Sequence, residues 1–258
     1  MTTAPNAPVT RPGRTALVAV ILAFAAGATD AFAFLQLGAV FTANMTGNLV
    51  LAGLVQRPDY AASLAGIVTA IAIFAATLYI ALRYAEPGST AKSAAVLAAS
   101  VVAQVAVLAL WATWPSPNTS LAVVPFIALS AVAMACQTAA ARRLDSASGV
   151  TTTYVTGTIT SLMANAADRK PQPAGLRIGV IAALVLGALA GALLIQLHPL
   201  YGAALPVLPA AVATVLTASA HALPGTHPSP RMMEPSHEHD RHIRAHLHRR
   251  ARRAHRDR

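Results

Sequence analysis

Long apolar runs alternate with short polar stretches along this chain. Two of the apolar runs, about 44–56 and 152–166, are short, polar at the start and apolar towards the end. The others have about the 20 residues that a helix needs to cross roughly 30 Å of hydrocarbon: 15–39, 61–83, 93–114, 119–141, 175–197 and 201–221. This pattern predicts an all-α polytopic membrane protein.

The positive charges decide between six and eight crossings, because Lys and Arg stay on the cytoplasmic side. With the N-terminus inside and eight crossings, six of these charges lie inside and four outside. With six crossings only Arg57 lies outside, and nine lie inside: Arg11, Arg14, Arg83, Lys92, Arg142, Arg143, Arg169, Lys170 and Arg177. We therefore expect six transmembrane helices, two re-entrant or broken segments, and both termini on the cytoplasmic side of the membrane.

The apolar segments of the two halves follow the same order. Three spans in each half would invert the second half relative to the first, so the sequence predicts two inverted repeats, 15–114 and 119–221. Residues 1–14, with three prolines, are expected to be disordered. Residues 222–258 form a basic tail rich in His and Arg.

A polar break opens the short segment of each half, at Phe41–Asn48 and at Thr151–Thr158. Broken helices at membrane depth are where transport proteins place binding sites, and two facing helix N-termini would favour an anionic or strongly polar solute. Asn44 and Thr46 are candidates to cap the first short helix, and Gly47 permits close backbone approach. The candidate binding residues of the breaks are Asn44, Thr46, Gly47, Asn48, Tyr154, Thr156, Gly157 and Thr158. The alternative is that Thr-Gly and Gly-Asn pairs serve only close helix packing.

Asp30 is the acid that lies deep within a full-length span. An intramembrane carboxylate is costly and is therefore a functional candidate, in hydrogen bonding or proton coupling. The alternative is an anchor for a half-helix N-terminus or a partner for a neighbouring span. Gln137 occupies a similar place in the second half and is its expected neutral counterpart.

Composition narrows the function classes. Charged residues make up 11% of the chain, against about 25% in a soluble domain. Residues 231–258 supply +5 of the net charge of +10, so the basicity indicates a tail drawn to anionic lipid head groups and no nucleic-acid partner. A single cysteine excludes a disulfide framework, and we find no metal site, cofactor motif or catalytic constellation. We expect no enzyme, and homo-oligomerisation is left open.

Two signatures in the chain resemble those of the YoaK family, bacterial inner-membrane proteins defined by a domain of unknown function. The first comprises Gly27–Ala31, Phe34-Leu35, Gly38, Val40-Phe41 and Asn44–Asn48, and the second comprises Gln137 and Thr152–Thr158. The resemblance covers about residues 15–222 and implies about six spans. Ala133 and Ala135 stand where the family pattern suggests a glycine. The resemblance implies no particular substrate.

The sequence therefore favours a transporter or channel-like permease for a small polar or anionic solute, with proton coupling through Asp30 as a further hypothesis. The alternative is a membrane scaffold or sensor whose basic tail recruits a partner. A transporter should lose activity on Asp30→Asn or Thr46→Val, whereas a scaffold should fail on deletion of 231–258.

Overall fold

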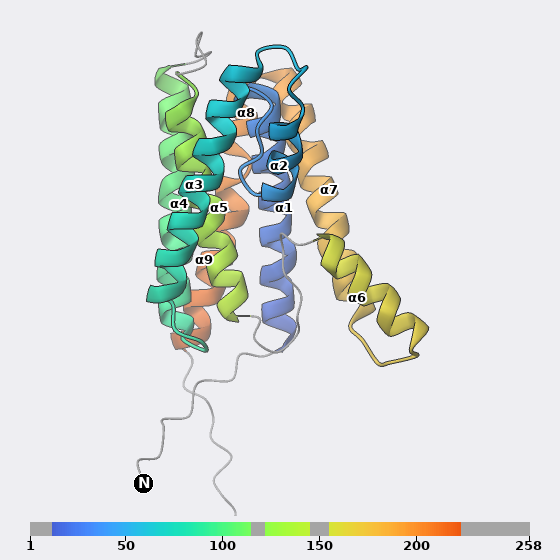
Figure 1. Ribbon diagram of the computed structural model, residues 1–258. Coiled ribbons are helices and arrows are strands. Elements are labelled where there is room, and N and C mark those ends of the chain that lie inside the picture. Colours follow the sequence, from blue (N-terminus) through green and yellow to red (C-terminus); the bar gives the residue numbers. More distant parts are fainter. Residues whose placement is uncertain (1–11, 115–121, 145–154, 223–258) are drawn as a thin grey trace, which may run out of the picture. The chain divides into compact units, whose positions relative to one another are not determined.

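The computed structural model describes residues 12–114, 122–144 and 155–222, all within one compact unit, Met1–Leu223. These residues form helices joined by short links, with no strand among them (Figure 1). The helices are α1 (Pro12–Gln36), α2 (Met45–Gly53), α3 (Tyr60–Tyr84), α4 (Thr90–Thr113), α5 (Val124–Leu144), α6 (Val155–Ala167), α7 (Ala174–Leu197), α8 (Pro199–Ala204) and α9 (Val207–Ala222).

Six helical segments are long and apolar enough to cross a membrane, which confirms the predicted fold class. They are α1, α3, α4, α5, α7 and the combined segment of α8 and α9. The two remaining helices are short. At 1.5 Å per residue, the 9 residues of α2 and the 13 residues of α6 extend over less than the roughly 30 Å of a bilayer core.

The spans alternate in direction. After α1 the chain turns back into the bundle and returns through α2 to the same end (Figure 1). We call this the Gly38 end. At the opposite end Arg14 donates to Ser219, and Arg143 Nη2 donates to the carbonyl of Leu82 at 2.6 Å. Of the described Lys and Arg residues, only Arg57 lies at the Gly38 end. The others define the basic end: Arg14, Arg83, Lys92, Arg142, Arg143, Arg169, Lys170 and Arg177.

Two local backbone features were not predicted from the apolar runs. The first span ends at Gln36 instead of residue 39, since Gly38 and Ala39 adopt left-handed backbone conformations with φ of 87° and 55°. The last span is interrupted between α8 and α9, because Pro206 has no N–H to continue the helical hydrogen bonds. The predicted start of the fourth span at 119 falls outside the described residues.

The closest helix crossing joins α1 to α7, and it depends on glycine. A Cβ atom on Gly27 would lie 2.0 Å from the carbonyl oxygen of Leu184, and one on Gly187 would lie 2.0 Å from that of Phe24. The backbones are therefore in contact, as small residues allow in membrane helices. The other main contacts join α3 to α5, α4 to α5, α4 to α9 and α1 to α9.

The core is largely alanine, with an aromatic cluster towards the Gly38 end. Phe32 and Phe126 each meet the ring of Trp111 edge-on, at centroid distances of 5.0 and 5.4 Å. Many large apolar side chains instead point outward, among them Val102, Leu197 and Leu208. Outward apolar surface on helices of this length is the surface that contacts the lipid bilayer.

Candidate functional site

The chain turns back into the bundle directly after α1. Gly38 and Ala39 reverse its direction, and residues 41–44 run without helical structure to the start of α2. Non-helical backbone at membrane depth needs hydrogen-bond partners from the protein, since lipid offers none. Three side chains, Asp30, Asn44 and Asn48, supply them.

Asp30 of α1 anchors this segment. Its Oδ1 accepts hydrogen bonds from the backbone N–H groups of Thr42 and Ala43, each at 2.8 Å, and from the hydroxyl of Thr42 at 3.4 Å. The anchoring role that the sequence left open is thus present. Asp30 is only partly buried, however, and it also lines a cavity. Its carboxylate is therefore accessible to a solute as well as bonded to the backbone.

Asn48 holds the segment from the other side. Its side-chain Oδ1 accepts from the backbone N–H of Phe41 at 2.9 Å, and its Nδ2 donates to the carbonyl of Phe41 at 2.6 Å. One fully buried amide therefore satisfies both backbone groups of Phe41. Asn48 is a structural residue in this arrangement and is absent from the cavity lining.

Asn44 caps α2 as predicted, whereas Thr46 lies inside the helix. The Oδ1 of Asn44 accepts from the N–H of Gly47 at 3.0 Å. Gly47 is in close contact with its surroundings, because a Cβ atom there would lie 2.9 Å from both Asn44 Nδ2 and Phe41 Cδ2. The close neighbours of Gly47 are thus side chains, whereas the sequence predicted a close approach of backbone.

An open cavity of about 790 Å³, which we call the central cavity, lies where α1, α2, α6 and α7 meet, and Asn44, Thr46 and Thr156 in its lining are exposed. It brings together the acid of the first span and residues of both polar breaks. Its polar or glycine lining comprises Gly27, Asp30, Asn44, Thr46, Gly47 and Thr156. Its apolar lining comprises Ala26, Ala31, Phe34, Leu35, Phe41, Ala43, Val50, Val155, Leu184 and Ala188.

Other predicted site residues lie elsewhere. Gly157 and Thr158 belong to the first turns of α6 but do not line the cavity. Gln137 is buried in α5, away from the cavity, and its Nε2 has no hydrogen-bond partner within the described part of the chain. Tyr154 lies outside the described residues.

Sequence reasoning did not assign Phe34, Phe41, Leu184 or Ala188 to the site. The rings of Phe34 and Phe41 stack with centroids 5.0 Å apart beside the cavity. Both phenylalanines belong to the first signature, so the signal was present. Leu184 and Ala188 reach the cavity because Gly27 and Gly187 let α7 approach α1 so closely.

A second cavity, of about 490 Å³, lies at the Gly38 end. It is lined by the links that follow α1 and α2, and by the start of α3 and α5. Arg57 and Asp59 contribute opposite charges to it, and Nη1 of Arg57 is buried without a hydrogen-bond partner among the described residues. Phe34 and Leu35 line both cavities, so they separate the two.

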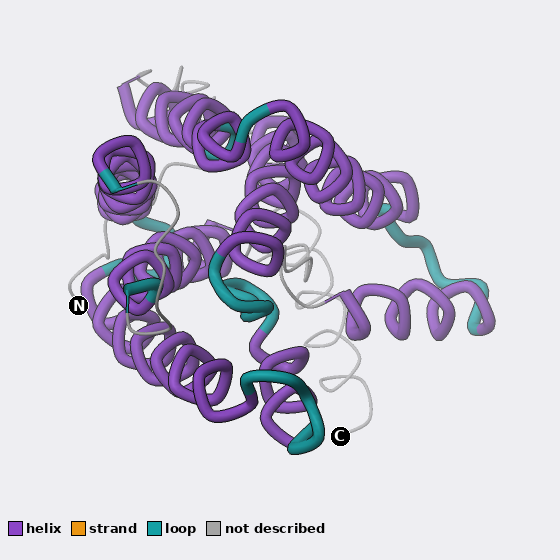
Figure 2. The backbone as a smooth tube through the Cα atoms, turned by 90° about the horizontal axis from the view of Figure 1, so that it is seen from above, coloured by secondary structure: helices purple, strands orange, loops and turns teal. Residues whose placement is uncertain are grey.

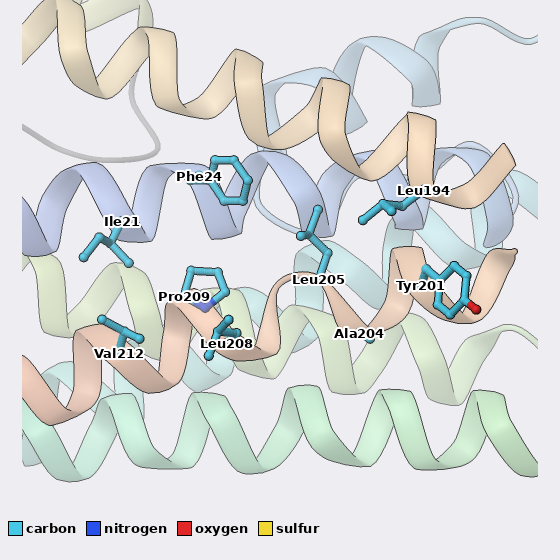
Figure 3. A pocket seen from close by; sticks show the side chains of 9 residues that line it. All are labelled: Ile21, Phe24, Leu194, Tyr201, Ala204, Leu205, Leu208, Pro209 and Val212. Carbon is cyan, nitrogen blue, oxygen red and sulfur yellow. The ribbon is translucent and has the colours of Figure 1, made fainter. Parts of the chain in front are cut away.

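A third cavity is a groove of about 610 Å³ along α1, α7, α8 and α9 (Figure 3). Its lining is apolar apart from the hydroxyl of Tyr201 at one end: Ile21, Phe24, Leu194, Ala204, Leu205, Leu208, Pro209 and Val212. It follows the interruption between α8 and α9. Such a surface fits lipid acyl chains and offers no polar chemistry.

The described residues contain no group of three or more His, Cys, Asp or Glu side chains placed to hold a metal ion. The histidines of the basic tail fall outside the described residues. Cys136 is a free cysteine buried among apolar neighbours.

Comparison with known proteins assigns the chain to a family. Residues 18–219 match the family described as protein of unknown function (DUF1275). The chain is similar to the UPF0700 transmembrane protein YoaK of Bacillus subtilis (strain 168), with 30% identity over 170 residues, which cover 64% of this chain and 75% of that protein. No solved structure matches. With both signatures and the six apolar spans in place, this chain belongs to the DUF1275 family of membrane proteins, to which YoaK is related.

Proposed function

We propose that this protein is a permease that moves a small polar solute across the membrane. The supporting observation is the cavity in which Asp30, Thr46 of the first break and Thr156 of the second break meet. Its volume lies within the roughly 300–1,000 Å³ of small-molecule sites. An acid and broken helices inside a membrane domain are costly, and transport is the function that most often requires them.

The pattern of helix contacts supports the inverted repeats that such permeases use. Exchange of α1 with α5, α3 with α7, and α4 with α9 turns the α1–α7 contact into the α5–α3 contact. The same exchange turns α4–α5 into α9–α1 and leaves α4–α9 unchanged. Exchange of α2 with α6 turns α2–α3 into α6–α7. Exchanged spans also run in opposite directions (Figure 1).

The two short helices differ in how they pack. α2 lies against α3 within the bundle, whereas α6 extends away from the other helices (Figures 1 and 2). Only the beginning of α6, at Val155 and Thr156, reaches the cavity. In the proposed permease the two halves hold the solute from opposite sides. From the cavity, α2 leads back to the Gly38 end and α6 leads to the basic end (Figure 1).

The cavity at the Gly38 end supplies one side of the route. A solute that passes from it to the central cavity would pass Phe34 and Leu35, which line both. The basic end faces the cytoplasm in this proposal, because Lys and Arg are retained there. The route past Phe34 then opens to the outside. Proton coupling through Asp30 stays a hypothesis.

Water access to the cavity tests the proposal without knowledge of the solute. In a Cys136→Ala background, a cysteine replaces the exposed residue Thr46, and the purified protein is reconstituted into liposomes, where lipid surrounds it, before treatment with uncharged 2-hydroxyethyl methanethiosulfonate. A permease should react at this cysteine. Ala131→Cys, in a fully buried position of α5, is the dry control, and Pro87→Cys, in the exposed link between α3 and α4, is the wet control.

Uptake into proteoliposomes from a panel of radiolabelled solutes then tests transport itself. Thr46→Val should lower uptake, whereas Thr69→Val should not, because the hydroxyl of Thr69 bonds only its own helix and lies outside the cavity. A cysteine at 46 that reacts no faster than one at 131 would refute the permease. The scaffold alternative instead predicts that deletion of 231–258 abolishes function while the Thr46 variants keep it.

A further inference from the structure

Among the described residues, the central cavity has a single charged residue in its lining. Asp30 carries that charge, and none of the other lining residues is Lys, Arg or His. The described basic residues lie at the two ends of the bundle, where Arg57 lines the separate cavity of the Gly38 end. A solute in the central cavity therefore meets a carboxylate without a protein cation beside it.

Two helix N-termini favoured an anion in the sequence, and the partial positive charge of the one at α2 is already offset. Asp30 accepts hydrogen bonds from the backbone N–H groups of Thr42 and Ala43, which lie just ahead of α2. Asn44 caps the helix itself. A carboxylate at this position neutralises the partial positive charge of the helix start. An anionic solute would then be repelled by the charge of Asp30.

The remaining lining suits an apolar body that bears a positive charge. Phe34 and Phe41 stack beside Asp30, and aromatic faces attract cations. Leu35, Val50 and Leu184 add apolar surface. A small inorganic cation would leave this surface unused, whereas an organic cation would contact the aromatic and aliphatic side chains together with the carboxylate.

We infer that the central cavity binds a hydrophobic organic cation, an ammonium group on an apolar body, with Asp30 as the counter-charge and Phe34 and Phe41 as the aromatic contact. This inference rests on the proposed function, because it names the solute class of the same site. It specifies that the transported solute carries a positive charge and has an apolar body.

Two thiol reagents of opposite charge test the sign of the site. In the Cys136→Ala, Thr46→Cys protein, reaction rates are measured with 2-(trimethylammonium)ethyl methanethiosulfonate and with 2-sulfonatoethyl methanethiosulfonate. Each rate is divided by the rate of the same reagent at Pro87→Cys, which removes the intrinsic difference between the reagents. We expect the corrected ratio of the cationic to the anionic rate to be about 10 or more.

Asp30→Asn should bring this ratio back towards 1, since the amide removes the charge but keeps an oxygen for the N–H groups of Thr42 and Ala43. Asp168→Asn is the matched control, because Asp168 is an exposed acid in the link between α6 and α7 that lines neither the central cavity nor the cavity at the Gly38 end. It should leave the ratio unchanged. Size-exclusion profiles and thermal unfolding establish that both variants are folded.

A second readout does not depend on any change at Asp30. Tetraphenylphosphonium and its anionic counterpart of the same shape, tetraphenylborate, are compared for protection of Thr46→Cys from the uncharged reagent. We expect protection by the phosphonium alone. Phe34→Leu keeps the apolar volume but removes a ring, so it should weaken this protection by about 2- to 30-fold.

The outcomes separate the two proposals. Reaction of the cysteine at 46 with the uncharged reagent, with a corrected ratio of 1 or below, or protection by tetraphenylborate, would overturn the cationic class and leave the permease standing. No reaction with the uncharged reagent would remove the permease and the cationic site together. A ratio above 1 that persists in Asp30→Asn would overturn the role of Asp30 as the counter-charge.

Discussion

At the scale of single residues, the polar side chains of the first break act mainly as substitutes for backbone hydrogen bonds. Asn48 replaces the missing partners of Phe41, and Asp30 replaces those of Thr42 and Ala43. Because lipid cannot hydrogen-bond, these side chains allow the non-helical residues 41–44 to lie among the membrane-spanning helices. The site is therefore built on the same residues that hold its backbone in place.

Removal of the Asn48 amide should destabilise the protein strongly. Asn48→Ala leaves the part-buried N–H and carbonyl of Phe41 without their partner, which costs up to roughly 1–3 kcal/mol for each group in free energy of unfolding. Thermal unfolding in detergent should show a clear fall in Tm. Asn165→Ala in α6 is the control, since its side chain makes no hydrogen bond within the described residues. An unchanged Tm for Asn48→Ala would contradict the bridging role.

The sequence identified most of these residues but not their pairing. Asp30, Asn44, Thr46, Gly47 and Thr156 were assigned to the site from an intramembrane acid and a repeated polar break, and all of them line the cavity. Asn48 was assigned with them, yet it faces Phe41. Which side of a short helix a side chain takes depends on how the chain turns at Gly38 and Ala39, and the local pattern does not contain that turn.

At the scale of helices, apolar run length predicted the spans well because the bilayer fixes the length that a helix needs. The predicted 61–83 and 175–197 correspond to Tyr60–Tyr84 and Ala174–Leu197. Run length did not predict which helices touch. The α1–α7 crossing depends on two glycines that meet the opposite backbone, and such a match between distant segments is visible only in three dimensions.

This crossing leads to a prediction about two glycines on one helix. Gly187→Ala would place a Cβ atom 2.0 Å from the carbonyl oxygen of Phe24, so α1 and α7 must move apart at a cost of about 1–3 kcal/mol or more. Gly179→Ala would place its Cβ 3.9 Å from Val20, an ordinary contact. It should leave Tm unchanged or raise it, since alanine favours a helix by up to about 1 kcal/mol.

Thermal unfolding of both α7 variants in the same detergent measures the difference. Because the two substitutions are chemically identical, helix propensity cancels and the contact with α1 remains. An equal Tm for the two variants would show that α1 and α7 do not approach this closely.

At the scale of the whole molecule, the charge distribution and the two short helices determine how the chain lies in the membrane. All described Lys and Arg residues except Arg57 are gathered at the basic end, which faces the cytoplasm in the proposed six-span arrangement. Whether the short helices enter and leave on one side decides whether the two breaks can meet at the cavity.

Two exposed link residues test this arrangement, because six and eight crossings give opposite results at both. Single cysteines at Gln56, after α2, and at Pro87, after α3, are placed in the Cys136→Ala background and treated with a membrane-impermeant thiol reagent. Six spans put Gln56 outside, where it is labelled in intact cells, and Pro87 inside, where it is labelled only after the cells are opened. Pro87 is preferable to Gly88, whose φ of 79° would strain a cysteine. The reverse pattern at both sites would mean that α2 lies in a segment that crosses the membrane, and the meeting of the two breaks at one cavity would lose its basis.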